Sequence, residues 1–123
     1  PGDQRLWRAF HQPDQLYKQG GGIKPAFFRD KNGLSCDLAR FSTVEKSRLG
    51  YGPQPRPAGA GLVEVLVSTA RKAGTDVKHI PLKAPFFNYS HTQFETHLDS
   101  EHAKIICEDP TTRFIVRPEL DQL

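Results

Sequence analysis

The residues that could do chemistry in this sequence lie in three separate segments. Arg8 lies in RLWRAF, and Ser35 and Asp37 lie in LSCDL. His102 lies in EHAKII, at the start of a strand-like run. An arginine that faces a cleft can bind a carboxylate or phosphate through two parallel hydrogen bonds, and a histidine exchanges protons near neutral pH. These four side chains predict a small enzyme if the fold gathers them around one cleft.

Each of the four residues also has a structural explanation, and the sequence leaves both explanations open. Arg8 falls on the apolar side of its strand pattern, where a charged group needs a partner such as Asp37. The alternation of LSCDL turns Ser35 and Asp37 away from the buried face, which an exposed sheet face explains equally well. His102 is also explained as a capped or surface histidine.

A stretch near the C-terminus contains the donor types of a zinc site. Its members are His91, Glu95, His97, Glu101, His102 and Cys107. Their spacing matches neither paired CxxC motifs nor HExxH, and a single helix cannot turn all of them to one side. The sequence therefore predicts solvated helix and loop residues here, with no metal ion and no cofactor.

The two cysteines, Cys36 and Cys107, lie in apolar segments with strand-like patterns. Leu34 and Leu38 stand at alternate positions around Cys36, and Ile105 stands in the same relation to Cys107, so each thiol shares a buried strand face. We expect both to be buried, unbridged thiols in one sheet core. Reduced thiols and the lack of a segment resembling a signal peptide favour the cytoplasm.

Strand-like alternation recurs along the chain and predicts a sheet. It covers 5–10, 34–39, 62–67, 77–82, 102–107 and 113–117, with a further short aromatic run at 26–30. Asn32-Gly33 and Asp109-Pro110 have turn chemistry, and we expect each to join two antiparallel strands in a hairpin.

Short helices are predicted between these strands. Ser42 and Glu45 have the spacing of a capping box before a helix over 43–49, and Ser68 is expected to cap a helix that ends at Gly74. Phe94 and Leu98, one helical turn apart, indicate another helix over 92–98. Because helices and strands do not alternate regularly, we expect residues 1–123 to form one α+β domain, with a mainly antiparallel sheet of six or seven short strands and two or three short helices.

Charge and hydropathy exclude some function classes. Lys and Arg number 17 against 14 for Asp and Glu, which gives a net charge of +3, but the signs are mixed along the chain. No Lys/Arg run forms a track for phosphates, so the pattern does not favour nucleic acid. No apolar run approaches the roughly 18 residues of a membrane-spanning helix.

An aromatic cluster offers a surface for a protein partner. Phe86, Phe87 and Tyr89 follow Pro85 in a segment that is poor in helix and strand signals. Exposed aromatic side chains are natural anchors in protein interfaces, although the same residues could instead fold back over the core. Because no acid, base and nucleophile converge in one motif, a non-enzymatic, partner-binding domain is the leading functional hypothesis, and the enzyme cleft is the alternative.

Several segments together resemble small uncharacterised bacterial single-domain proteins. LWRAFHQP matches an early segment with an arginine and an HP-like pair, FRDKNGLSCD matches an FRD-GLS-D hairpin, and EHAKII matches a late HA-x-I strand. The resemblance implies a bacterial origin and the same order of elements. The long stretch from Lys83 to Ser100 departs from the pattern just before His102.

The chain is also similar to ADP-ribosyltransferase-like folds in the order of a few residues. Arg8 on an early strand is followed by Ser42-Thr43 and then by Glu64 or Glu95. This similarity implies a transferase activity for the alternative, enzymatic hypothesis. Ser42 and Thr43 are equally explained by helix capping.

Overall fold

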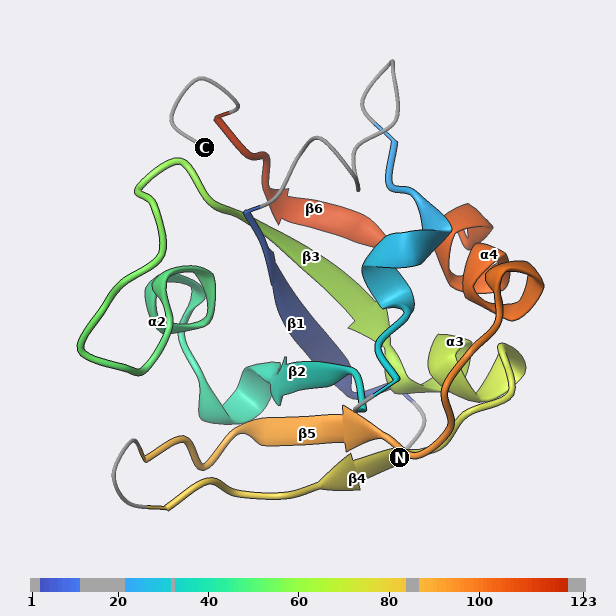
Figure 1. The fold of residues 1–123 in the computed structure, drawn as a ribbon, viewed down its shortest axis with the longest axis horizontal. Coiled ribbons are helices and arrows are strands. Elements are labelled where there is room, and N and C mark those ends of the chain that lie inside the picture. Colours follow the sequence, from blue (N-terminus) through green and yellow to red (C-terminus); the bar gives the residue numbers. More distant parts are fainter. Residues whose placement is uncertain (1–2, 12–21, 32, 84–86, 120–123) are drawn as a thin grey trace.

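A six-stranded sheet forms the centre of the computed structural model, which describes residues 3–11, 22–31, 33–83 and 87–119 (Figure 1). The strand order is β4-β5-β2-β1-β3-β6, and every neighbouring pair is antiparallel. The strands are β1 (Arg5–Phe10), β2 (Ser35–Leu38), β3 (Gly61–Leu66), β4 (Val77–His79), β5 (His91–Phe94) and β6 (Arg113–Val116).

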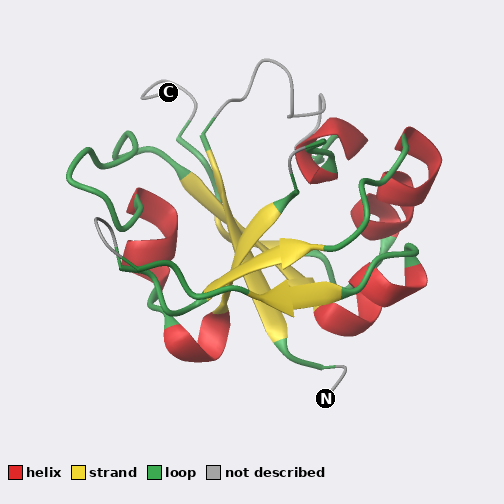
Figure 2. Cartoon of the chain, turned by 60° about the horizontal axis from the view of Figure 1, so that its bottom comes forward, coloured by secondary structure: helices red, strands yellow, loops and turns green. Residues whose placement is uncertain are grey.

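Short helices cover both faces of this sheet (Figure 2). They are the 3-10 helices η1 (Pro25–Phe28) and η2 (Ala39–Phe41), and the α-helices α2 (Val44–Leu49), α3 (Val67–Lys72) and α4 (Ser100–Glu108). The sheet and helices confirm the predicted α+β class. Each helix in the described part of the chain is too short or too polar to cross a bilayer.

The alternation of β1 divides the apolar residues between the two faces. Leu6 and Phe10 are fully buried in the larger core, which η1, α3 and α4 cover. Trp7 packs on the opposite face with Leu62 and Ala39, beside α2. The central strand β1 is therefore buried on both sides, which fixes its register against its neighbours.

The two neighbours of β1 pair with it over different lengths. β3 pairs along the whole strand, from Arg5↔Leu66 to Phe10↔Gly61, whereas β2 pairs only at Leu6↔Leu38 and Trp7↔Asp37. Beyond Trp7, β2 pairs with β5 alone and its direction diverges from that of β1 (Figure 1). This fork between β1 and β2 is the structural feature on which the candidate site depends.

A buried carboxylate joins β1, β3 and β6 on the α2 side of the sheet. Glu64 is 3% exposed and accepts a hydrogen bond from Trp7 Nε1 at 3.1 Å. Arg113 and Arg5 approach the same carboxylate at 3.2 and 3.5 Å. A buried charge is tolerated only when it is paired and hydrogen-bonded, and this one is both.

Neither predicted hairpin forms. The aromatic run 26–30 is not a strand, because Pro25 begins a 3-10 helix whose Phe27 and Phe28 are both buried. The Asn32-Gly33 hairpin is therefore wrong, and Asn32 itself lies outside the described residues. The Asp109-Pro110 hairpin is wrong as well, because the segment before it is the helix α4.

The late apolar segment forms a helix because its N-terminus is capped and its burial has a helical period. Asp99 accepts a hydrogen bond from the backbone N–H of His102 at 2.8 Å, as an N-cap does. Ala103 and Ile106 are fully buried, whereas Ile105 is 39% exposed. The expected helix over 92–98 is wrong too, since this segment begins with β5, which pairs with both β2 and β4.

The remaining predicted elements are confirmed with small shifts. The helix expected over 43–49 is α2, but its N-cap is Thr43, which accepts from the N–H of Lys46, and not Ser42. The helix expected before Gly74 is α3, and Ser68 lies inside it. The strands expected at 5–10, 62–67 and 113–117 are β1, β3 and β6.

The cysteines agree with the prediction only in part. Cys36 is buried in β2, as the alternation of LSCDL predicted. Cys107 lies on α4 and is half-buried against the same core, so its placement in the sheet is wrong. No disulfide joins these two residues, both of which the structure describes.

Replacing Glu64 by alanine should lower the free energy of unfolding by about 2 kcal/mol, because the indole N–H of Trp7 would remain buried without an acceptor. Glu45→Ala removes an exposed carboxylate that pairs with Arg48 at 2.8 Å, and should cost less than about 1 kcal/mol. Urea unfolding of the two variants measures both values. Equal losses would show that the Glu64 carboxylate does not stabilise the sheet.

Candidate functional site

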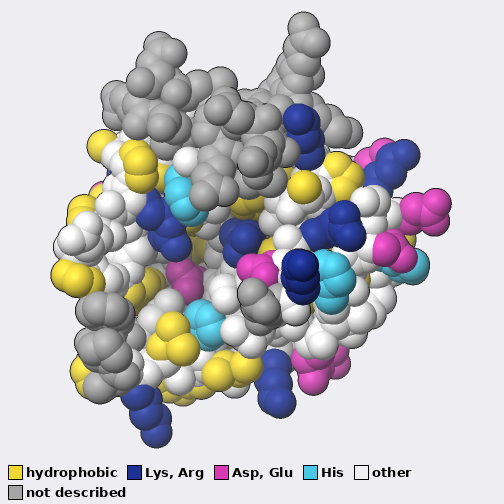
Figure 3. Space-filling model, viewed as in Figure 1, with side chains coloured by type: hydrophobic (Ala, Val, Ile, Leu, Met, Phe, Trp, Pro, Cys, Tyr) yellow, Lys and Arg dark blue, Asp and Glu magenta, His cyan; other side chains and the backbone are white. Residues whose placement is uncertain are grey.

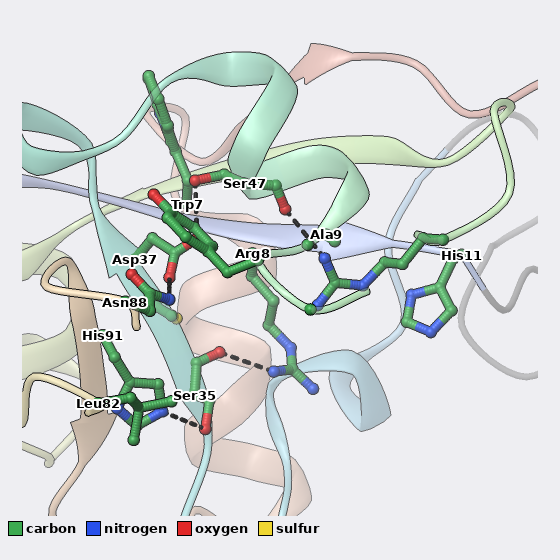
Figure 4. A pocket seen from close by; sticks show the side chains of 15 residues that line it. Trp7, Arg8, Ala9, His11, Ser35, Asp37, Ser47, Leu82, Asn88 and His91 are labelled. Atoms are coloured by element: carbon green, nitrogen blue, oxygen red, sulfur yellow. Dashed lines mark hydrogen bonds between the residues drawn. The ribbon is translucent and has the colours of Figure 1, made fainter. Parts of the chain in front are cut away.

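A cavity of about 290 Å³ opens at the fork between β1 and β2 (Figure 4). Three of the four predicted site residues line it: Arg8, Ser35 and Asp37. His102 does not line it, but lies exposed in the first turn of α4, where its Nδ1 contacts the Asp99 carboxylate at 2.7 Å. Three residues that the sequence analysis did not assign to the cleft also line it, namely His11, Arg56 and His91.

Arg8 fills the space where β1 and β2 separate. Its Nη1 donates to the carbonyl oxygen of Ser35 at 2.8 Å, and its Nε donates to that of Phe27 at 3.2 Å. The guanidinium also lies over the Phe27 ring, 5.2 Å from its centroid. Within the described part of the chain its hydrogen bonds go to carbonyls and not to Asp37, and Nη2 has no hydrogen-bond partner there.

Asp37 is held by donors on both of its oxygens. Ser47 donates to Oδ2 at 2.7 Å, and the amide nitrogen of Asn88 donates to Oδ1 at 2.9 Å. Further hydrogen bonds through Ser42, Tyr51 and Ser90 connect Ser47 back to Asn88, which closes a ring of side chains at the wall of the cavity. The carboxylate is therefore a fixed negative charge, oriented before any ligand arrives.

Ser35 and His91 form a hydrogen-bonded pair across two strands. His91 Nδ1 lies 2.9 Å from the carbonyl oxygen of Ile80, and His91 Nε2 lies 3.2 Å from Ser35 Oγ. A carbonyl oxygen only accepts, so Nδ1 carries a proton, and the tautomer of the neutral ring that this contact selects presents a lone pair on Nε2. In that tautomer the Ser35 hydroxyl is the donor to Nε2.

The cavity is lined by more positively charged than negatively charged side chains. Arg8 and Arg56 contribute positive charge, and Asp37 is the one carboxylate among the described lining residues. Burial lowers the pKa of His11, and the charges of Arg56 and Arg8 lower it further. His11 Nδ1 is buried without a hydrogen-bond partner among the described residues.

The thiol of Cys36 is not a candidate nucleophile, although it lies at the cavity wall. Burial raises its pKa to about 12, so it carries no thiolate near neutral pH. The residues named for the ADP-ribosyltransferase similarity do not gather around Arg8 either. Glu64 and Glu95 do not line the cavity, and Thr43 is occupied in capping α2.

An exposed aromatic patch lies at the edge of the sheet outside this cavity. We define it by the three rings of Phe41, His79 and Tyr89, together with the exposed Phe87, which lies two residues before Tyr89 in the chain. Phe87 is 70% and Tyr89 61% exposed, whereas Phe86 lies outside the described residues. Phe41, His79 and Tyr89 pack ring against ring, with centroids 4.8 to 5.7 Å apart.

The donor-rich stretch near the C-terminus is divided among several elements. His91 is in β5, His97 is in the following loop, and His102 and Cys107 are on α4. Nowhere in the described ranges do three histidine, cysteine or carboxylate side chains come together as metal ligands would. On the face drawn in Figure 3, Lys and Arg are interspersed with acidic, apolar and uncharged side chains and form no continuous basic strip.

Comparison with protein-family models, with curated proteins and with solved structures found no match for this chain. Its function must therefore be argued from the cavity itself.

The low pKa of His11 predicts a pH dependence of stability. Because the folded pKa lies below the ordinary value of 6.5, the unfolded chain takes up a proton first as the pH falls. The stabilisation from neutral His11 is complete above about pH 6.5 and is lost as the pH falls towards the folded pKa. Denaturant midpoints measured between pH 7 and pH 5 should therefore fall less steeply in His11→Gln than in the parent. His97→Gln, which changes an exposed histidine, should leave the slope unchanged; equal slopes for all three proteins would contradict the assignment.

Proposed function

We propose that the protein binds a small molecule carrying a carboxylate or phosphate group in the cavity at the β1–β2 fork. The observation that carries this proposal is the placement of two arginines in a cavity whose described lining has a single carboxylate, Asp37, which already accepts hydrogen bonds from Ser47 and Asn88. An anionic ligand supplies the negative charge that the side chains leave unmet.

Arg56 is the cation best placed to hold such a ligand. Its Nη1 donates to the carbonyl oxygens of Ser47 and Arg48 at 3.2 and 3.5 Å, which orients the guanidinium against α2. Burial lowers its pKa, and the negative charge of Asp37 counteracts that effect. A partly buried guanidinium binds an anion more strongly than an exposed one because water competes less for it.

His11 adds a second ligand contact. Its buried Nδ1 lacks a partner within the described chain, and an anion beside it would favour the protonated ring, opposing the effect of Arg8 and Arg56. The cavity of about 290 Å³ is at the lower end of the size of small-molecule sites. A compact metabolite, or the charged end of a larger one, fits this volume.

Arg56→Gln should weaken binding of the anion roughly tenfold to a hundredfold, which corresponds to losing one charge-assisted contact. Inorganic phosphate, succinate and a nucleoside monophosphate are suitable probes, with binding followed by NMR shifts of the backbone amides of Ser35 and Asn88. Lys104→Gln removes the same charge from an exposed ion pair on α4 and should leave the affinity unchanged. Absence of saturable shifts with all three probes would refute the proposed function.

A protein partner at the aromatic patch is a second candidate function, favoured by the exposure of Phe87 and Tyr89. The segments 39–43, 77–83 and 87–91 carry Arg40, Lys78 and Lys83 and contain no acidic residue. The guanidinium of Arg40 lies over the Phe41 ring, 4.5 Å from its centroid, so a basic group borders the aromatic rings, which suits an acidic segment with aromatic or aliphatic anchors. We further propose that the protein acts in the bacterial cytoplasm, where its two unbridged thiols would stay reduced.

A synthetic peptide that alternates glutamate with leucine should shift the NMR signals of Tyr89 and Phe41, and Phe87→Ser should weaken that binding because it removes the most exposed anchor. The same peptide with lysine in place of glutamate is the matched control and should not bind. Equal shifts with both peptides, or none with either, would exclude this second function.

A further inference from the structure

We propose that Ser35 and His91 are a nucleophile and its general base, and that they cleave small esters that carry an anionic group. The substrate class rests on the anion-binding function proposed above, whereas the chemistry of the pair rests on its own geometry. Ser35 Oγ and His91 Nε2 are 3.2 Å apart, at the limit of the roughly 2.6–3.2 Å expected for a serine and its base.

The orientation of His91 is what makes it a base. Its Nδ1–H is occupied by the carbonyl oxygen of Ile80 at 2.9 Å, so the ring is held in the tautomer that keeps Nε2 unprotonated. In serine hydrolases a carboxylate commonly orients the histidine in this way. Here a backbone carbonyl takes that position, and Asp37 is engaged by Ser47 and Asn88.

The pair is built on the rigid part of the fold. Ser35 lies in β2 and His91 in the neighbouring strand β5, where the register Asp37↔His91 and Ser35↔Gln93 sets the two side chains diagonally on one face. His91 is 8% exposed, so its ring is fixed by packing as well as by hydrogen bonds. Sites on paired strands hold their geometry better than sites on loops.

Arg8 supplies positive charge beside the nucleophile. Its Nη1 is bonded to the backbone oxygen of Ser35, which holds the guanidinium next to the residue whose Oγ would attack (Figure 4). Its Nη2 has no partner within the described chain and can donate to an oxyanion. A donor fixed in advance where negative charge develops stabilises the transition state.

The other hydroxyls near the cavity lack these conditions. Ser47 donates to Asp37, and the Ser42, Tyr51 and Ser90 hydroxyls are engaged in the same ring of hydrogen bonds. Among the described residues that line the cavity, Ser35 is the hydroxyl that faces a histidine nitrogen. The nucleophile is therefore assigned by its partner and not by exposure alone.

The reaction balances without a cofactor or an external oxidant. Ser35 Oγ bonds to the ester carbonyl carbon while its proton passes to His91 Nε2, and the carbonyl oxygen takes up the negative charge. As the carbonyl re-forms, the bond to the alcohol oxygen breaks, and that oxygen receives the proton from His91. Water then attacks the acyl-serine with His91 again as base, which releases the acid and restores Ser35.

Two measurements test the pair. First, a small alkyl fluorophosphonate should modify Ser35, with loss of fluoride, and mass spectrometry should locate the adduct there. Second, 4-nitrophenyl butyrate and mono-(4-nitrophenyl) succinate form a matched neutral and anionic ester pair, whose cleavage is followed by release of nitrophenolate. We expect hydrolysis of both esters, with the anionic ester preferred.

Matched variants separate chemistry from folding. Ser35→Ala should abolish the adduct and the hydrolysis above background, and His91→Gln should lower the rate by roughly 10²–10⁴, the contribution of a general base. Ser100→Ala, which alters an exposed serine bonded to Arg29, should behave like the parent protein. Unfolding curves confirm that each variant is folded at the assay temperature.

The outcomes distinguish the two proposals. If Ser35 is unmodified and Ser35→Ala cleaves both esters as fast as the parent, the nucleophile assignment is wrong, whether or not phosphate or succinate binds. If Ser35 reacts but the two esters are cleaved equally and Arg56→Gln changes neither rate, the nucleophile assignment stands and the anion pocket is wrong.

Discussion

The rest of the site depends on the hydrogen bonds that the Arg8 side chain donates to two backbone carbonyls. Its guanidinium lies between β1 and β2 and joins the Ser35 and Phe27 carbonyls, which belong to separate segments. Hydrogen bonds from a charged group contribute about 1.5–3 kcal/mol each, more than neutral ones. With these bonds made through a side chain, the two backbones need not pair beyond Trp7, and the fork remains open. Side-chain hydrogen bonds from Arg8 thus replace the backbone hydrogen bonds that would otherwise join the two strands. The cavity lies in the space between the separated strands.

The local sequence pattern predicted those strands in which apolar and polar residues alternate regularly. LSCDL places buried residues at every second position, RLWRAF divides its apolar residues between the two faces of the sheet, and both form strands. The pattern was misleading where the same apolar residues fit both the two-residue period of a strand and the 3.6-residue period of a helix. The segment 102–107 is apolar enough for a strand, but the cap at Asp99 and the burial of Ala103 with Ile106 make it a helix. The strand β5 was missed because its stability comes from β2 and β4, distant in the sequence.

The candidate site was predictable to the same extent. Strand alternation turns Ser35 and Asp37 away from the core, and this places them at the cavity without any knowledge of the partner strands. The histidine could not be chosen by the same argument. His91 reaches Ser35 only because β5 pairs with β2 across 56 residues of sequence, and no local pattern encodes that pairing. The strand-like pattern of 102–107 favours His102 instead, but this segment is part of the helix α4.

The division of charge within the cavity explains why one site would both bind an anion and act on it. Asp37 keeps its negative charge, but the hydrogen bonds from Ser47 and Asn88 fix its carboxylate at the cavity wall, and the two arginines outnumber it. Arg56 can hold the permanent charge of a ligand, while Arg8 lies beside the atom where new negative charge would appear. Binding of the ligand's permanent charge by Arg56 would then position the ester beside Arg8. Because the contact with Arg8 strengthens only as negative charge develops in the transition state, it would raise the reaction rate and not merely the affinity.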